Sequence, residues 1–236
     1  MKNNIVIFDF ETVGYGPEKF SATNTATCDP IQVAAVPVDG RTLKIHREKA
    51  FVSSIKPTKG VDKVSQDSLE FHAKVRGCTI DELKADLDKA PSLNAVWPSF
   101  VDYVRGQSVG KGFTNLPIAA GHNIKDFDMP ILERINKDVG DSKMVFHPRD
   151  YIDTMNMMFL WMESDARVEK YTLDYLRDFF GLDKKGGHDA LKDCLDCSLI
   201  IKRFVKYQRY LVNRVDGDGK RLLELKNSFK TWKDED

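Results

Sequence analysis

The chain has 236 residues, of which 42% are hydrophobic, so it is long enough to form one large domain with a sizeable core. Its 36 Lys and Arg residues balance 36 Asp and Glu residues, which excludes a charged disordered polymer and argues against wrapping of long duplex nucleic acid. No apolar run approaches the roughly 20 residues of a membrane-spanning helix. Four cysteines are too few for a disulfide scaffold. We therefore expect a soluble cytoplasmic protein in a reducing compartment, with no membrane partner.

Short apolar segments rich in β-branched residues predict strands, most of them in the first half of the chain. The predicted strands are Ile5–Phe8, Ile31–Val38, Lys49–Ile55, Pro117–Gly121 and part of Val145–Asp153. Apolar residues at helical spacing alternate with the later strands. The predicted helices are Asp81–Ala90, Ala95–Arg105, Met129–Val139, Thr154–Met162, Thr172–Phe180 and Asp189–Val212. This order predicts an α/β fold with a mixed sheet flanked by helices.

The sequence shows no internal repeat and no boundary that would separate a second domain. We expect one domain over residues 1–212 and a polar, Lys-rich tail over residues 213–236 that is not a separate domain. The apolar block Met155–Met162 is predicted to belong to the core.

Two acidic residues, Asp9 and Glu11, follow the first predicted strand at positions i and i+2. Side chains alternate across a strand, so these two carboxylates project from the same face. Two like charges side by side lower the stability of the fold unless they share a cation or a proton. The alternative interpretation is a strand end that enters solvent, where acidic residues are common.

A second acidic segment, residues 121–132, runs from a strand end into a helix start. Asp128 stands near the amino end of that helix, where the helix dipole stabilises an anion. A simple capping role is the alternative. Asp126 is the competing candidate, and we favour Asp128 because Pro130 marks the helix start and Phe127 supplies an apolar anchor before the acid.

The third segment contains His188 and Asp193 at the start of the last predicted helix. Asp193 shares one helical stripe with Ala190 and Cys197, and an ionised carboxylate on a buried stripe must be paired or bound to a metal. Gly186-Gly187 allows the backbone before His188 to change conformation, as a residue of a mobile lid would require. A histidine in a surface loop is the simpler interpretation.

Together, the three segments supply four carboxylates and one histidine from separate element ends. Oxygen ligands select hard cations such as Mg²⁺ or Mn²⁺. Two such ions about 3.5–4 Å apart stabilise the attacking and leaving oxygens of a phosphoryl displacement. A histidine, which changes charge near neutral pH, is suited to deprotonate a water.

The order of these motifs resembles that of the DEDDh 3′→5′ exonucleases, most closely the proofreading epsilon-subunit type. The three matching motifs are Asp9-Phe10-Glu11-Thr12, His122-Asn123 with Phe127-Asp128, and His188-x-Ala190-x-x-Asp193. The likeness covers roughly Ile5 to Val205. It implies an RNase-H-like fold, an exonuclease domain over residues 1–212, and two bound Mg²⁺ or Mn²⁺ ions.

The resemblance also implies roles for individual residues. Asp9, Glu11, Asp128 and Asp193 match the family's catalytic metal ligands, and His188 matches its general base. Thr12, His122 and Asn123 match positions that bind the nucleic acid near its 3′ terminus.

The predicted function is metal-dependent removal of nucleoside 5′-monophosphates from single-stranded or frayed DNA 3′ ends. A DNA polymerase or another replication or repair protein is the expected partner, with proofreading or DNA repair as the setting. The first alternative is an exoribonuclease of the same fold that acts on RNA 3′ ends, as in the RNase T and oligoribonuclease relatives. The second is a non-catalytic module that binds nucleic-acid ends or a partner protein.

Overall fold

The structure is a computed structural model that describes residues 2–16, 25–140, 143–163, 165, 168 and 170–213. The predicted tail lies outside these residues from position 214 onward. The chain divides into two compact units, residues 1–198 and 199–236, which we describe separately. The described part of the second unit, residues 199–213, continues the last helix. The domain boundary expected after residue 212 stays a prediction.

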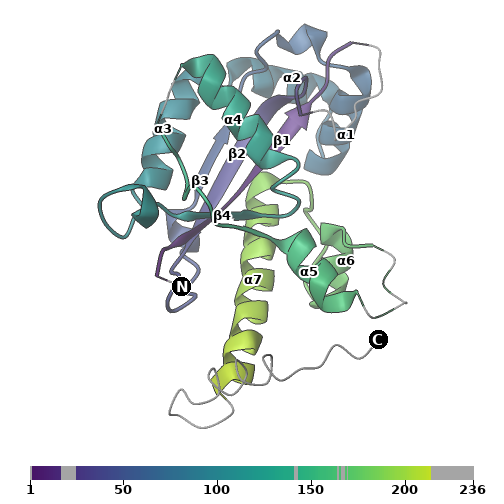
Figure 1. Cartoon of the computed structure of the whole chain (residues 1–236). Coiled ribbons are helices and arrows are strands. Elements are labelled where there is room, and N and C mark those ends of the chain that lie inside the picture. The colour runs from purple at the N-terminus through teal and green to yellow at the C-terminus, as the bar shows by residue number, and fades with distance from the viewer. Residues whose placement is uncertain are drawn as a thin grey trace, which may run out of the picture. The chain divides into compact units, whose positions relative to one another are not determined.

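A five-stranded sheet forms the centre of the first unit (Figure 1). Its strands are β1 (Ile5–Val13), β2 (Asp29–Val38), β3 (Phe51–Ser54), β4 (Ile118–Gly121) and β5 (Tyr151–Asp153). They lie in the order β3-β2-β1-β4-β5. β1, β2 and β3 pair antiparallel, whereas β4 runs parallel to both β1 and β5. The predicted mixed sheet is therefore confirmed.

Helices connect and cover these strands. They are α1 (Gln66–Arg76), α2 (Ile80–Lys89), α3 (Leu93–Arg105), α4 (Asp128–Val139), α5 (Thr154–Met162), α6 (Leu173–Phe179) and α7 (Ala190–Asn213). Short 3-10 turns lie at Arg47–Lys49, Val61–Lys63 and Phe113–Asn115. Helix α1 was not among the predicted helices, because its composition is mostly polar. Its ends carry recognisable signals, because Ser65 accepts a hydrogen bond from the Ser68 amide and Gly77 adopts a left-handed conformation.

Strand β1 is longer than the four residues predicted from its apolar run. It continues through Asp9 and Glu11 because β2 pairs with it as far as Val13. The two acids therefore lie within the strand and not after its end, which corrects the predicted boundary. Alternation places Phe8 and Phe10 on one face of the sheet and the two carboxylates on the other.

The face of Phe8 carries the main core, which is formed with residues of α3 and α4. The Phe8 ring stacks on Phe146 with 4.9 Å between ring centroids, and Trp97 and Phe100 are buried in the same cluster. At Gly121, a Cβ atom would lie 3.0 Å from the Phe8 carbonyl oxygen, so β4 approaches β1 closely only because this residue lacks a side chain. The core therefore fixes β1 rigidly from the side opposite the carboxylates.

A second apolar cluster packs α1 and α2 against the C-terminal end of β1 and the N-terminal part of β2. Leu69 of α1 and Leu83 and Leu87 of α2 are buried with Val13 and Ile31. This packing places α1 beside the end of β1 that carries Glu11.

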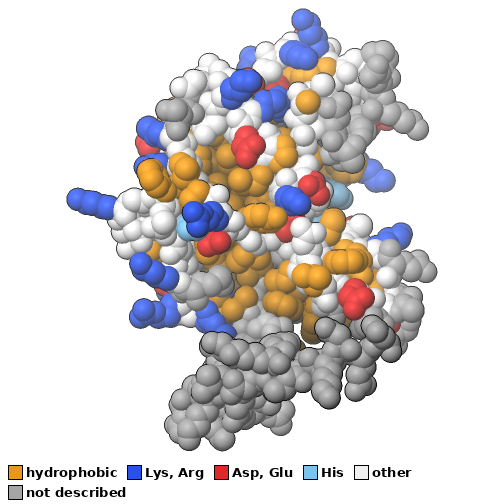
Figure 2. Space-filling view, viewed as in Figure 1, with side chains coloured by type: hydrophobic (Ala, Val, Ile, Leu, Met, Phe, Trp, Pro, Cys, Tyr) orange, Lys and Arg blue, Asp and Glu red, His pale blue; other side chains and the backbone are white. Residues whose placement is uncertain are grey.

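Helix α5 has the predicted bounds, but part of its apolar block is not core. Phe159, Leu160 and Trp161 are exposed, whereas Met158 and Met162 are buried. An apolar run on a short helix buries only the stripe that faces the protein. Figure 2 shows hydrophobic side chains gathered over α5 and α6. Within the described residues, none of the helices combines the length and the apolar character required to cross a membrane.

Candidate active site

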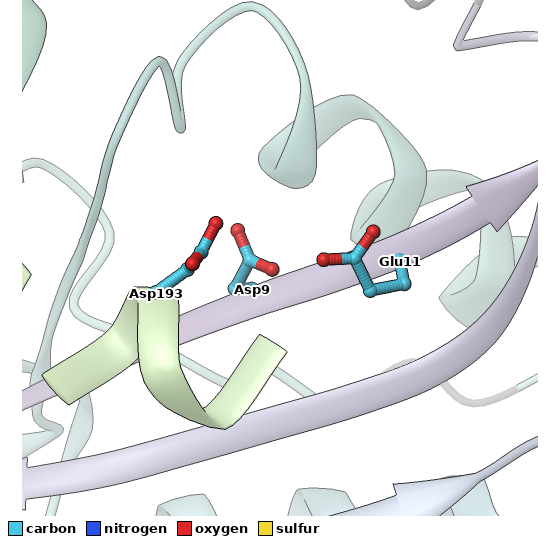
Figure 3. A group of neighbouring side chains, drawn as sticks. All are labelled: Asp9, Glu11 and Asp193. Atoms are coloured by element: carbon cyan, nitrogen blue, oxygen red, sulfur yellow. The ribbon is translucent and has the colours of Figure 1, made fainter. Parts of the chain in front are cut away.

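Three of the four predicted carboxylates converge in space (Figure 3). Asp9 and Glu11 project from β1, and Asp193 projects from the first turn of α7. One carboxylate oxygen from each residue lies within 4.8 Å of those of the other two. Asp193 therefore forms a single acidic group with two residues that lie more than 180 positions earlier in the chain.

Contacts with β2 hold the start of α7 over this face of the sheet. The Gln32 side chain donates from Nε2 to Asp189 Oδ2 at 3.3 Å and accepts the Ala190 amide at Oε1 at 3.4 Å. One turn later, the Cys194 thiol donates to the Ala34 carbonyl at 3.6 Å. Gln32 thus bridges strand and helix close to Asp193.

Asp128 lies beside this acidic group. It is not among the residues whose carboxylate oxygens all lie within 4.8 Å of one another. Its side chain is 1% exposed, and its Oδ1 accepts a hydrogen bond from the Phe10 amide at 3.0 Å. Because β4 pairs with β1 only over Ile5–Ile7, Asp128 supplies a partner for the Phe10 amide where that pairing has ended. Asp126, the competing candidate, is exposed. The structure therefore places Asp128, and not Asp126, against β1.

Burial and mutual repulsion raise the pKa values of this carboxylate cluster. The pKa of Asp9 lies well above its usual value, first because of burial and then because of the charges of Asp128, Glu11 and Asp193. Burial, together with Asp193, raises the pKa of Glu11 to about 8. Carboxylates crowded in this way hold protons or a cation, and their oxygen atoms are ligands of the kind that Mg²⁺ and Mn²⁺ prefer. The residues present therefore fit divalent cations.

A cavity of about 480 Å³ opens over the carboxylates, a size typical of small-ligand sites. It is lined by Asp9, Phe10, Glu11, Thr12, Asp67, Ser68, Phe71, His72, Phe127, His188 and Asp193. The lining combines acidic residues with aromatic rings. Four of the lining residues come from α1, the helix that the sequence analysis missed.

His188 is exposed in the turn before α7 and lines the cavity. Its backbone has a left-handed φ of 64°, and Gly186 in the same turn has a φ of 80°. The imidazole packs edge-on against Phe71 of α1, with 5.1 Å between ring centroids. The turn and this aromatic contact together hold the ring at the wall of the cavity that the carboxylates also line.

The three residues predicted to bind nucleic acid have different surroundings. Thr12 lines the cavity, and its carbonyl accepts a hydrogen bond from His72 Nε2 at 2.9 Å. His122 contacts Thr154 Oγ1 through Nδ1 at 2.9 Å, and burial lowers the pKa of its ring to about 4. The Asn123 amide donates to Asp153 Oδ1 at 3.1 Å. His122 and Asn123 do not line the cavity, so their predicted contact with substrate stays a prediction.

Two residues outside the predicted set, Asp153 and Arg177, contact segments that carry site residues. Asp153 ends β5 and accepts the amides of Asn123 and Lys125, which fixes the turn that precedes Asp128. Its place before a helix start is a recognisable capping signal. Arg177 is buried beside Asp193. Its burial could not be predicted, because a single arginine in a short amphipathic helix is usually exposed.

Residues 6–200 match the model of the RNase_T family, which is described as Exonuclease. No curated protein matches the chain. Similar solved structures include cell-death related nuclease 4 (CRN-4), with a TM-score of 0.66 and 19% identity, covering 87% of this chain and 64% of that chain. E. coli exonuclease I in complex with a 5cy-dT13 oligonucleotide has a TM-score of 0.63 and 20% identity, covering 89% and 42% of the two chains.

A third structure is the nuclease domain of 3′hExo, described as a DEDDh family member bound to rAMP. It has a TM-score of 0.62 and 18% identity, covering 87% of this chain and 92% of that chain. The chain spans less than two thirds of the CRN-4 and exonuclease I chains. At these identities the likeness establishes the fold, and it confirms the RNase-H-like architecture expected from the motifs. Because the family match runs through residues 6–200 and includes all three motifs, the chain belongs to the RNase_T family of exonucleases.

Proposed function

We propose that this protein is a metal-dependent 3′→5′ exonuclease that releases nucleoside 5′-monophosphates from single-stranded or frayed DNA ends. The observation that carries this proposal is the convergence of Asp9, Glu11 and Asp193 at a cavity that His188 also lines. A module that only binds nucleic-acid ends gains nothing from crowding like charges, because they repel the phosphate backbone unless cations neutralise them.

In this proposal Asp9, Glu11, Asp128 and Asp193 hold two divalent cations, Mg²⁺ or Mn²⁺. Bound there, such ions offset the charge of the phosphate and of the leaving 3′ oxygen. Asp128 serves from a fixed position, because its hydrogen bond to the Phe10 amide holds the carboxylate against β1. Asp193 is supplied by the first turn of α7.

His188 acts as the general base that accepts a proton from the attacking water. Its exposed ring lines the same cavity as the carboxylates, so a water above them lies within its reach. The rings of Phe71 and Phe127 give that cavity an apolar wall on which a terminal base or sugar can pack. Thr12 lines the same cavity and contacts the 3′ terminus in this proposal.

DNA is the proposed substrate, and RNA is the alternative that the same site admits. Similar structures have been solved with each type of ligand, dT13 in exonuclease I and rAMP in 3′hExo. The distinction depends on how the site treats a 2′-hydroxyl group. A polymerase or repair partner and a cytoplasmic location remain part of the proposal, and four free cysteines agree with a reducing compartment.

The proposal is tested by offering single-stranded DNA, single-stranded RNA and mismatched duplex DNA side by side, with Mg²⁺ or Mn²⁺. Substrates labelled at the 5′ end should give a ladder that shortens from the 3′ end, with nucleoside 5′-monophosphates as products. DNA should be degraded at least about tenfold faster than RNA, since a site that rejects one hydroxyl gains roughly one to two factors of ten. Faster degradation of RNA would support the exoribonuclease alternative. Binding of oligonucleotide without any cleavage would support the non-catalytic module.

A paired substitution decides between the two acids of the second motif. Asp128→Asn should reduce hydrolysis by at least about 10³-fold, because it removes a charge from the metal site while the amide oxygen still accepts from Phe10. Asp126→Asn should leave the rate within about threefold of the native value, because that side chain is exposed. Initial rates on single-stranded DNA measure both variants. The reverse order would transfer the ligand role to Asp126.

A further inference from the structure

A fully buried arginine on α6 joins the candidate active site to the helices that support it. Arg177 is 1% exposed and donates to three aspartates. Its Nη2 contacts Asp193 Oδ1 at 2.5 Å, its Nε contacts Asp196 Oδ2 at 2.7 Å, and its Nη1 contacts Asp174 Oδ1 at 2.6 Å. Only Asp193 among these belongs to the acidic group.

The geometry of this contact limits how Asp193 can move. A guanidinium is planar and carries its donors in a rigid fork, so Nη2 cannot follow a rotating Asp193 without losing the bonds to the other two aspartates. The hydrogen bond from Arg177 Nη2 is accepted by Oδ1 of Asp193. It therefore holds the carboxylate by one oxygen in the orientation that brings the residue within reach of Asp9 and Glu11.

The same guanidinium supports the turn that carries His188. A Cβ atom at Gly187 would lie 3.0 Å from Arg177 Nη1 and 3.5 Å from its Cζ, so the Gly187 backbone rests directly on the guanidinium. Gly186 and His188 flank this contact in left-handed conformations. A single buried side chain thus contacts both a predicted metal ligand and the turn of the predicted base.

We propose that Arg177 is a positioning residue that orients the Asp193 carboxylate toward Asp9 and Glu11 before any cation binds. The proposal rests on the proposed function, since it assigns Asp193 to a metal site. A residue that orients a ligand acts on metal affinity, and removal of such a partner commonly weakens binding by about 10–100-fold. A residue that serves only the fold would alter stability and leave the affinity of the folded protein unchanged.

The test measures Mn²⁺ binding to the full chain by calorimetry, without nucleic acid, in variants whose melting curves show that they are folded. Arg177→Met keeps most of the side-chain volume and should weaken Mn²⁺ binding by about 10–100-fold. Raising Mn²⁺ should then recover much of the lost activity, with the KM for the oligonucleotide within about threefold of native. Asp174→Asn is the matched control, because it removes an outer partner of the same guanidinium, and it should stay within about threefold of native affinity.

Two further variants keep the test decisive if Arg177→Met does not fold. Arg177→Lys retains the charge and loses the fork, so it should bind Mn²⁺ at least about fivefold more weakly than native. The double variant Arg177→Met/Asp196→Leu removes both members of a buried pair, which the fold tolerates better than the loss of one, and it should show the full loss of affinity.

Native or tighter Mn²⁺ binding in the folded Arg177 variants would overturn the proposal, as would an equal loss in Asp174→Asn. These outcomes are separable from failure of the proposed function. If the native protein binds Mn²⁺ and degrades nucleic acid while the Arg177 variants keep native affinity, only the role of Arg177 is wrong. If the native protein binds no Mn²⁺, both proposals fail.

Discussion

Asp9→Asn is expected to lower the rate of 3′-end hydrolysis by more than about 10⁴-fold, which corresponds to several kcal/mol of lost transition-state stabilisation. Its carboxylate belongs to the converging group, and the charges of Asp128, Glu11 and Asp193 all act on it. An amide keeps the shape of the side chain and removes the charge that a divalent cation needs. Initial rates on single-stranded DNA at saturating Mn²⁺ measure the loss, and calorimetry should show at least about tenfold weaker Mn²⁺ binding.

The same substitution should stabilise the metal-free protein. Burial and neighbouring carboxylates raise the pKa of Asp9 well above its usual value, and burial together with Asp193 raises the pKa of Glu11 from 4.5 to about 8. An acid with a raised pKa in the folded state disfavours folding once the unfolded chain loses its proton. The Tm of the metal-free native protein should therefore fall as pH rises from about 4.5 to about 8. Asp9→Asn should weaken this fall, with about 2–4 °C gained for each kcal/mol of repulsion removed.

Asp81→Asn provides the control, because Asp81 is an exposed acid in the first turn of α2, away from the cavity. It should leave hydrolysis and Mn²⁺ binding within about threefold of native. Added Mn²⁺ should raise the Tm of the native protein and of this control more than that of Asp9→Asn. An Asp9→Asn protein that hydrolyses DNA within tenfold of native would show that this carboxylate is not a metal ligand.

His188→Ala is expected to reduce kcat by about 10²–10⁴-fold, the range that general-base catalysis contributes. The imidazole is exposed beside the carboxylates and packs on Phe71, so it can be removed without opening the core. Calorimetric Mn²⁺ affinity should stay within about threefold of native, because the ring is not among the converging oxygen ligands. Loss of kcat with retained metal binding would distinguish the base from the metal ligands.

The rate of the native enzyme should rise with pH in a way that requires His188, because a histidine base accepts a proton only while its ring is unprotonated. The measurement follows kcat from about pH 5.5 to about pH 8.5 at saturating metal and substrate. His188→Ala should lose this dependence, whereas the control His46→Ala should keep it, because His46 is a partly buried histidine that contacts Glu48 and does not line the cavity. A native rate in His188→Ala, or a flat native profile, would contradict the assignment of the base.

Local patterns in the sequence predicted most of the elements, because contiguous residues set strand and helix periodicity. The bounds of α5 agree with the predicted Thr154–Met162, and the alternation along β1 placed Asp9 and Glu11 on one face. The order of the three acidic motifs also predicted the family, since residue types at fixed spacing are visible without coordinates. The predicted length of β1 was wrong because its extension depends on pairing with β2, which lies some twenty residues further along.

Tertiary structure revealed the contacts that hold the predicted residues and the supporting residues around them. Asp128 is distinguished from Asp126 by a hydrogen bond to Phe10, a residue 118 positions away. Helix α1 brings Phe71 to the cavity, although its polar composition gave no helical stripe to recognise. Arg177 is buried only because three aspartates surround it in the fold. Neighbouring residues determine the periodicity of a strand or helix. Burial and convergence depend on contacts between distant segments, and those contacts exist only once the chain has packed.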